Sequence, residues 1–289
     1  MLKPVNQFEP GKPLWWQWPT ILSLDAPAVA IAWQWLFSRV VGTSLNWYYH
    51  VILGTSVWLA YAADRWFEGW LLDQGQSLTQ RHWFYQRHRW LVFAMWCSCL
   101  VVAVTISATH LSSREFWTGI IMLVPVLLYL LSHQFAHRHH HWRVPKELYV
   151  ALLFVMGSSC FVWAGELDLL ATLGVPMALF GLLCFSNCAL ISIWESNVDQ
   201  HHGRSSLTLQ YPGSAKMIHA LPWVIAVLGF SYAWWEGGTL PLASACVATS
   251  GLLLGWVNFV AHHHGRELAR VLADTVLLTP LLAWWLLQL

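Results

Sequence analysis

Two pairs of acidic residues with the same spacing mark the part of this sequence that can do chemistry. Asp64 and Glu68 follow one hydrophobic stretch, and Glu195 and Asp199 follow another. Side chains four residues apart lie on one face of a helix, one turn from each other. Carboxylates are costly near a bilayer, and their oxygens are ligands that Mg²⁺ uses when it bridges a protein to a phosphate. We therefore expect the two pairs to hold a divalent metal and, through it, a phosphate group.

The composition predicts a membrane protein. Of the 289 residues, 57% are hydrophobic and only 10% are charged, and the mean hydropathy is +0.50. A soluble domain carries about 25% charged residues, so we expect an integral, multi-pass protein whose partners include membrane lipid. The 22 Trp residues fit rings that lie at the level of the lipid head groups. We expect no nucleic-acid partner.

Windows of about twenty apolar residues predict an all-α fold with nine transmembrane helices. The predicted spans lie near residues 26–45, 48–67, 90–110, 117–134, 147–165, 172–194, 219–235, 240–261 and 270–288. They form one transmembrane domain, residues 26–289. Residues 1–25 contain several Pro residues and no long apolar run, so we expect this segment to lie on the membrane surface.

The loop charges orient the predicted spans. Cytoplasmic loops are enriched in Lys and Arg. With nine spans, thirteen of the fifteen Lys and Arg residues lie on the side of the amino terminus, and only Arg39 and Arg114 lie on the other side. We therefore expect a cytoplasmic amino terminus, and both acidic pairs facing the cytoplasm from a plasma membrane or a bacterial inner membrane.

The acidic segments resemble the motifs of the UbiA superfamily of intramembrane prenyltransferases. Residues 60–68, AYAADRWFE, are similar to the family's first motif, NDxxDxxxD, and residues 195–199, ESNVD, are similar to its second, DxxxD. Residues 203–205, GRS, resemble the Gly-x-Lys-Ser that follows the second motif. The resemblance implies a UbiA-like bundle of nine helices with the motifs after the second and sixth.

Two basic segments extend the resemblance. Lys146, with Gly157 eleven residues later, is similar to a family stretch that begins with Lys-Arg, and residues 79–81, TQR, are similar to a Thr-x-x-Arg segment. The resemblance implies an enzyme, a prenyltransferase. It would transfer an isoprenyl group from a prenyl diphosphate donor to a hydrophobic acceptor, either an aromatic compound or a lipid.

That reaction gives each candidate residue a role. A prenyl diphosphate ionises when its leaving group is neutralised by a metal ion and by cationic side chains, and aromatic faces stabilise the allylic cation. The expected Mg²⁺ ligands are Asp64, Glu68, Glu195 and Asp199; the expected diphosphate ligands are Arg81, Lys146 and Arg204; the aromatic candidates are Tyr61 and Tyr149; and the four acids with Lys146 are the expected catalytic residues.

The first acidic motif departs from the family pattern. Ala60 and Tyr61 stand where the family has Asn and Asp, and Glu68 and Glu195 replace shorter Asp residues. One carboxylate is lost and two others reach further from the backbone. A degenerate protein that binds an isoprenoid lipid without turning it over is therefore an alternative hypothesis.

The histidines support a hypothesis of another class, a di-iron membrane desaturase or hydroxylase. Neutral imidazole is a good iron ligand, and HxxxH and HxxHH patterns fall on the side of the acidic pairs. The histidines concerned are His133, His137, His140, His141, His201, His202, His262, His263 and His264. A non-catalytic membrane scaffold is a third alternative. Asp274, inside the last predicted span, is expected to pair with a neighbouring helix rather than to act in catalysis.

Overall fold

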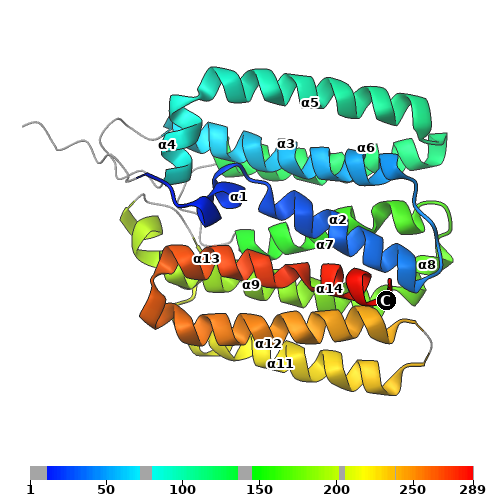
Figure 1. Cartoon of the computed structure of the whole chain (residues 1–289). Helices are drawn as coiled ribbons and strands as arrows, with labels where there is room; N and C mark the ends of the chain where they lie inside the picture. The colour runs from blue at the N-terminus through cyan, green and yellow to red at the C-terminus, as the bar shows by residue number, and fades with distance from the viewer. Residues whose placement is uncertain (1–11, 72–79, 136–144, 202–205, 238, 289) are drawn as a thin grey trace, which may run out of the picture.

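The computed structural model describes residues 12–71, 80–135, 145–201, 206–237 and 239–288. Within these ranges every regular element is a helix. The long helices run back and forth along one common direction (Figure 1). They are α2 (Asp25–Val40), α3 (Trp47–Leu71), α5 (Arg89–His110), α6 (Ser113–Phe135), α7 (Lys146–Trp163), α9 (Gly174–His201), α11 (Ala215–Trp235), α12 (Pro241–His264) and the broken run α13 (Arg266–Thr275), η3 (Val276–Leu278) and α14 (Thr279–Leu286).

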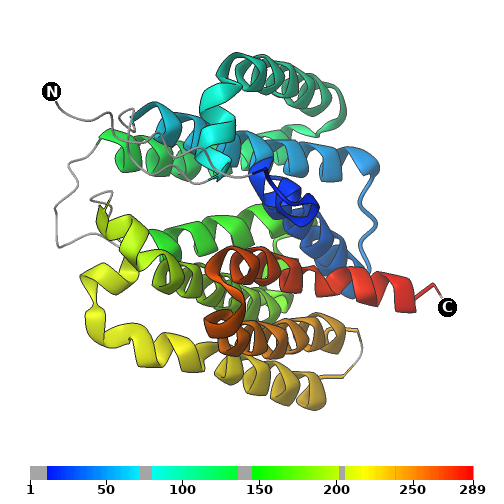
Figure 2. The ribbon, with the colours of Figure 1, turned by 60° about the vertical axis from the view of Figure 1, so that its left-hand side comes forward.

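Short helices connect the long ones or lie at the ends of the bundle. They are η1 (Trp15–Gln17), α1 (Trp18–Ile21), α4 (Gln80–Arg87), α8 (Asp168–Thr172), α10 (Leu207–Gln210) and η2 (Pro212–Ser214). In both overall views α3, α5 and α6 lie on one side of the bundle, α11 and α12 lie on the opposite side, and α2, α7, α9 and the α13–α14 run lie between them (Figures 1 and 2).

Seven of the described helical segments are long and apolar enough to cross a membrane. They begin at Arg89, Ser113, Lys146, Gly174, Ala215, Pro241 and Arg266, and the strongly bent pair Trp15–Ile21 and Asp25–Val40 would make an eighth. The multi-pass membrane class is thus confirmed, but the count of nine is not. Helix α3 corresponds to the second predicted span and has 25 residues. It is not among the seven segments, because its many Trp and Tyr residues and its charged carboxyl-terminal part lower its mean hydropathy.

The centre of the bundle is packed around an aromatic cluster. Trp33 of α2 stacks on Phe180 of α9, with ring centroids 4.0 Å apart, and Phe37 packs edge-on against the same ring. None of these three side chains is exposed. The Trp33 indole Nε1–H also donates to the carbonyl oxygen of Leu277, 2.9 Å away, at the break between α13 and α14. The cluster therefore fixes α2, α9 and the broken last span relative to one another.

The amino-terminal segment covers the end of the bundle at which α3 and α9 terminate. The buried Gln17 donates from Nε2 to Oε2 of Glu267, in the first turn of α13, over 2.8 Å. The indole of Trp58 donates to the carbonyl oxygen of Leu22 over 3.0 Å. Residues Gln17 to Leu22 thus connect the starts of α2 and α13 to α3.

Helices α11 and α12 approach closely along a stripe of small residues. A Cβ atom added at Gly229 would lie 2.9 Å from both the carbonyl oxygen of Ser244 and the Cβ of Ala248. A Cβ at Gly251 would lie 2.9 Å from the carbonyl oxygen of Pro222. Small residues at such crossings let helices pack in lipid, where no hydrophobic driving force joins them.

We predict that Gly229→Val lowers the free energy of unfolding by about 1–3 kcal/mol, the usual cost of overpacking, because the obstacle is the α12 backbone. Thermal unfolding in detergent, followed by circular dichroism, measures it. Gly119→Val on α6 is the matched control, because a Cβ there meets nothing within 4 Å. Equal transition midpoints for the two variants would contradict the close packing described here.

Candidate functional site

Both acidic segments lie at the same end of the bundle, where α3 and α9 terminate and α4 and α13 lie (Figure 1). Asp64 is partly buried on α3, and Glu195 is partly buried on α9. Glu68 and Asp199 belong to these helices, but their side chains lie outside the described residues, as does the whole of Arg204. The convergence of four carboxylates on one cavity stays a prediction.

Glu195 lies between two arginines from different helices. Its Oε2 accepts from Nη2 of Arg81 on α4, at 3.4 Å, and its Oε1 accepts from Nη1 of Arg270 on α13. The arginine side chains are only 10% and 16% exposed, and that of Glu195 is 27% exposed. These three side chains carry two positive charges and one negative charge. We call them the arginine–glutamate cluster; it brings together two residues that the sequence predicted and one that it did not.

Helix α4 positions Arg81. Tyr85, one turn further along α4, is almost fully buried, and its hydroxyl donates to Oγ of Ser23 over 3.1 Å. Phe84 meets the ring of Trp18 edge-on, with centroids 6.0 Å apart. Burial raises the pKa of Tyr85, so the phenol stays neutral and keeps donating. The amino-terminal segment thus holds α4, and with it the Arg81 guanidinium, against α9.

Arg270 is the member of the site that sequence reasoning missed. It was counted only as a loop charge that orients the protein. A signal was present, because Arg270 and Asp274 are four residues apart and so share one face of α13. Both side chains are directed toward α9: Arg270 pairs with Glu195, and Asp274 accepts from Nδ2 of Asn187 at 3.0 Å. The expected pairing of Asp274 with a neighbouring helix is confirmed.

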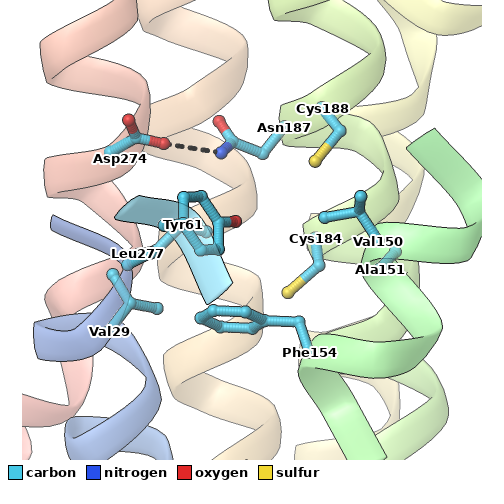
Figure 3. Close-up of a pocket in the computed structure, with 11 residues that line it drawn as sticks. Val29, Tyr61, Val150, Ala151, Phe154, Cys184, Asn187, Cys188, Asp274 and Leu277 are labelled. Carbon is cyan, nitrogen blue, oxygen red and sulfur yellow. Dashed lines mark hydrogen bonds between the residues drawn. The ribbon is translucent and has the colours of Figure 1, made fainter. Parts of the chain in front are cut away.

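A pocket lies on the inner side of the cluster. It is formed by α2, α3, α7, α9 and the α13–η3 break, and it is small, with a cavity volume of about 40 Å³ (Figure 3). Tyr61 precedes Asp64 by three residues, and Asn187 precedes Glu195 by eight. At the helical rise of about 1.5 Å per residue, the pocket therefore lies roughly one to two turns deeper in the bundle than Asp64 and Glu195. The polar lining of the pocket comes from Tyr61, Asn187, Asp274, Cys184 and Cys188. Its apolar lining comes from Ala26, Val29, Val150, Ala151, Phe154 and Leu277.

The start of α7 contacts the chain just after the second acidic motif. Lys146 is the first residue of α7. Glu147 beside it is 3% exposed, and its Oε1 accepts from the backbone N–H of Leu207 over 3.1 Å. Glu147 therefore ties α7 to the segment after α9. Tyr149 stacks on Tyr129 of α6, with centroids 5.6 Å apart, and is not among the described residues that line the pocket.

The histidine patterns fall mostly outside the described part of the chain. His137, His140, His141 and His202 lie in segments that are not described, and the side chains of the other histidines in those patterns are not described either. Among the described residues, no three His, Cys, Asp or Glu side chains form a group that could hold a metal ion. The di-iron hypothesis therefore gains no support here.

The donor chemistry of the described acids suits a divalent ion. Asp64 and Glu195 offer carboxylate oxygens, which Mg²⁺ prefers, and both side chains are partly buried at the same end of the bundle. The charge of Glu195 is already balanced by two guanidinium groups. A metal at Glu195 would compete with the arginines unless an anionic ligand draws them away, so metal and anion binding would support each other.

The fold defines the class of protein as a multi-pass helical membrane protein. No protein-family model and no curated protein matches its sequence. A solved structure has the same fold: the apo structure of a UbiA homolog from Aeropyrum pernix K1, with a TM-score of 0.59 at 12% identity. The match covers 91% of this chain and 98% of that chain. The predicted UbiA-like architecture is thus confirmed at the level of the fold.

We predict that Arg270→Gln and Glu195→Gln each lower the free energy of unfolding. In the double variant, the loss of unfolding free energy should be smaller than the sum of the two single losses. Arg270→Gln leaves Glu195 with one guanidinium group in place of two, and Glu195→Gln removes the carboxylate that both arginines share, whereas the double variant removes the Arg270–Glu195 pair as a whole. The coupling should reach about 1 kcal/mol in a thermal or denaturant double-mutant cycle. Arg266→Gln, at an exposed position of the same helix, should have little effect. Strict additivity would show that the ion pair has no energetic role.

Proposed function

We propose that the protein is an intramembrane prenyltransferase, which transfers an isoprenyl group from a prenyl diphosphate to a hydrophobic acceptor. The observation that carries this proposal is the arginine–glutamate cluster, which lies roughly one to two helical turns from a pocket in the bundle. The fold shared with a UbiA homolog supports it. An anionic head group and an apolar tail have complementary places in this arrangement.

The described cations suit a diphosphate. A guanidinium group forms two parallel hydrogen bonds to phosphate oxygens, and Lys acts as a point charge. Arg81 and Arg270 already meet at one carboxylate, so a diphosphate bound there would accept from both. Lys146 and Arg204 are proposed to add positive charge from the start of α7 and from the segment after α9. These groups would hold the leaving group and favour its departure.

The proposed Mg²⁺ ligands are the two acidic pairs. When bound, Mg²⁺ would neutralise charge on the leaving diphosphate. The residues proposed to hold it are Asp64, Glu68, Glu195 and Asp199. Glu195 would then exchange its arginine partners for the metal as the arginines turn to phosphate.

Aromatic and apolar side chains are proposed to receive the rest of the donor. Tyr61 and Phe154 line the pocket, and an aromatic face stabilises a nearby cation. Tyr149 is proposed for the same role from the start of α7. The isoprenyl chain would leave the pocket between helices toward lipid. The loop charges further support nine spans, with this end of the bundle in the cytoplasm.

A non-catalytic isoprenoid-binding protein is the second candidate, and two observations favour it. Tyr61, which replaces an acid of the first motif, lines the pocket, and Glu195 is already held by two arginines. Both features lower the number of carboxylate oxygens ready for metal. Such a protein would bind a prenyl diphosphate and release no pyrophosphate.

We predict that purified protein with Mg²⁺, farnesyl or geranylgeranyl diphosphate and a panel of aromatic and lipid acceptors releases pyrophosphate and forms a prenylated product. Asp64→Asn and Glu195→Gln should each lower the rate about 100-fold, because each removes a proposed ligand of the Mg²⁺ that would neutralise the leaving group. Asp168→Asn is the matched control, since Asp168 lies on α8, at the other end of the bundle (Figure 1). Binding of the diphosphate without release would establish the second candidate, and no binding would contradict both.

A further inference from the structure

The connection between α4 and α5 presents two arginines that lie on aromatic rings. The guanidinium carbon of Arg87 lies 5.0 Å from the ring centre of Trp83, one turn earlier on α4, and that of Arg89 lies 5.5 Å from the ring centre of Trp90. Both arginines are exposed, and so is Trp90. We call these four residues the α4–α5 elbow. Stacking on an indole fixes the plane of a guanidinium group and leaves its N–H edge for other partners.

No described carboxylate balances the charge of the elbow arginines. In the part of the chain that the structure describes, neither Arg87 nor Arg89 forms an ion pair. Arg81 differs, because it pairs with Glu195 on the inner side of α4. Arg81 and Arg87 are six positions apart, which at 3.6 residues per turn separates them by about 120° around the helix. Helix α4 therefore directs one cation inward to the arginine–glutamate cluster and another outward.

Helix α5 continues from the elbow as a candidate membrane span. It has the highest mean hydropathy of the seven candidate segments, and little of it is buried in the bundle. Leu91, Phe93 and Met95 follow the elbow and are exposed along α5. Arg89 is the first residue of α5, and exposed Trp side chains gather at the level of the lipid head groups. The elbow cations therefore lie at the depth of lipid phosphates, and the exposed apolar residues lie at the depth of acyl chains.

We propose that the α4–α5 elbow binds the head group of an anionic phospholipid, whose acyl chains lie along the exposed face of α5. A guanidinium group binds phosphate through two parallel hydrogen bonds, and basic sites beside membrane helices bind anionic head groups. The apolar face of α5 favours a membrane lipid over a free phosphate ion. The lipid would hold α4 from outside, while Glu195 holds it from inside through Arg81. The site does not depend on the proposed function, because it faces away from the arginine–glutamate cluster.

Native mass spectrometry of the purified full-length protein in detergent tests the proposal. The probes are phosphatidylglycerol and phosphatidylcholine with identical acyl chains, because both contain a phosphate but the choline group cancels its charge. We expect phosphatidylglycerol to bind about tenfold more tightly, the order expected for two arginines beside an anionic lipid. Arg87→Gln combined with Arg89→Gln should reduce this preference to less than about twofold, because both charges are removed.

Arg39→Gln combined with Lys216→Gln is the matched control. It removes the same charge from exposed positions on α2 and α11, away from the elbow (Figure 1), so the preference should equal that of the wild type. Circular dichroism verifies that both double variants are folded. Equal binding of the two lipids by the wild type, a full preference in the elbow variant, or the same loss in both double variants would overturn the proposal.

Glycerol 3-phosphate tests the source of the phosphate group, because it carries the charge without acyl chains. We expect it to bind the wild type far more weakly than phosphatidylglycerol does. Binding as tight as that of phosphatidylglycerol would overturn the assignment to a lipid. None of these measurements involves a prenyl diphosphate, so the lipid site and the proposed enzyme stand or fall separately.

Discussion

The pairing of Glu195 with two arginines is the interaction on which this end of the bundle depends. Three partly buried charges from α4, α9 and α13 meet there, and each would be costly in this setting without the others. Satisfying them requires α4 to fold back against α9 and α13 to begin beside both. The hydrogen bonds from Gln17 to Glu267 and from Tyr85 to Ser23 support the same placement. The polar end of the bundle is therefore held by charge and hydrogen bonding, while the centre is held by aromatic packing.

The arrangement separates two chemical environments along α9. Near Glu195 the two guanidinium groups favour an anion, and the Glu195 side chain is 27% exposed. Two turns deeper, Asn187 lies where water is scarce and an unmet hydrogen bond costs more. The proposed donor, a prenyl diphosphate, would use both environments, because its diphosphate end is anionic and its isoprenyl end is apolar. Each part of a bound substrate would lie where its transfer out of water costs the least free energy.

Sequence reasoning predicted the features that depend on local pattern. A bilayer requires long apolar helices, so each predicted span corresponds to a described helix or helical run. The spacing of the acidic residues also predicted that Glu195 lies near the end of one of these helices. Features that depend on distant residues were missed. Arg270 and Glu195 are 75 positions apart, and Asn187 and Asp274 are 87 apart. Asn187 lies inside an apolar run that gives no sign of its partner. The last span is broken just before Pro280, which has no N–H to donate to the carbonyl oxygen of Val276, and the distant Ser250 donates to that oxygen instead, over 2.8 Å.

Tyr61 shows how a departure from a motif can be understood from its neighbours. It stands where the resembling motif has an acid, which taken alone removes a negative charge from α3. In the bundle, however, Tyr61 lines the same pocket as Asp274 of α13 (Figure 3). A carboxyl group in this region is therefore supplied by a neighbouring helix, deeper in the bundle than Asp64 of the motif. A phenol at position 61 adds an aromatic face to the pocket without adding a second carboxyl group from α3. The substitution thus exchanges a potential metal ligand for an aromatic side chain.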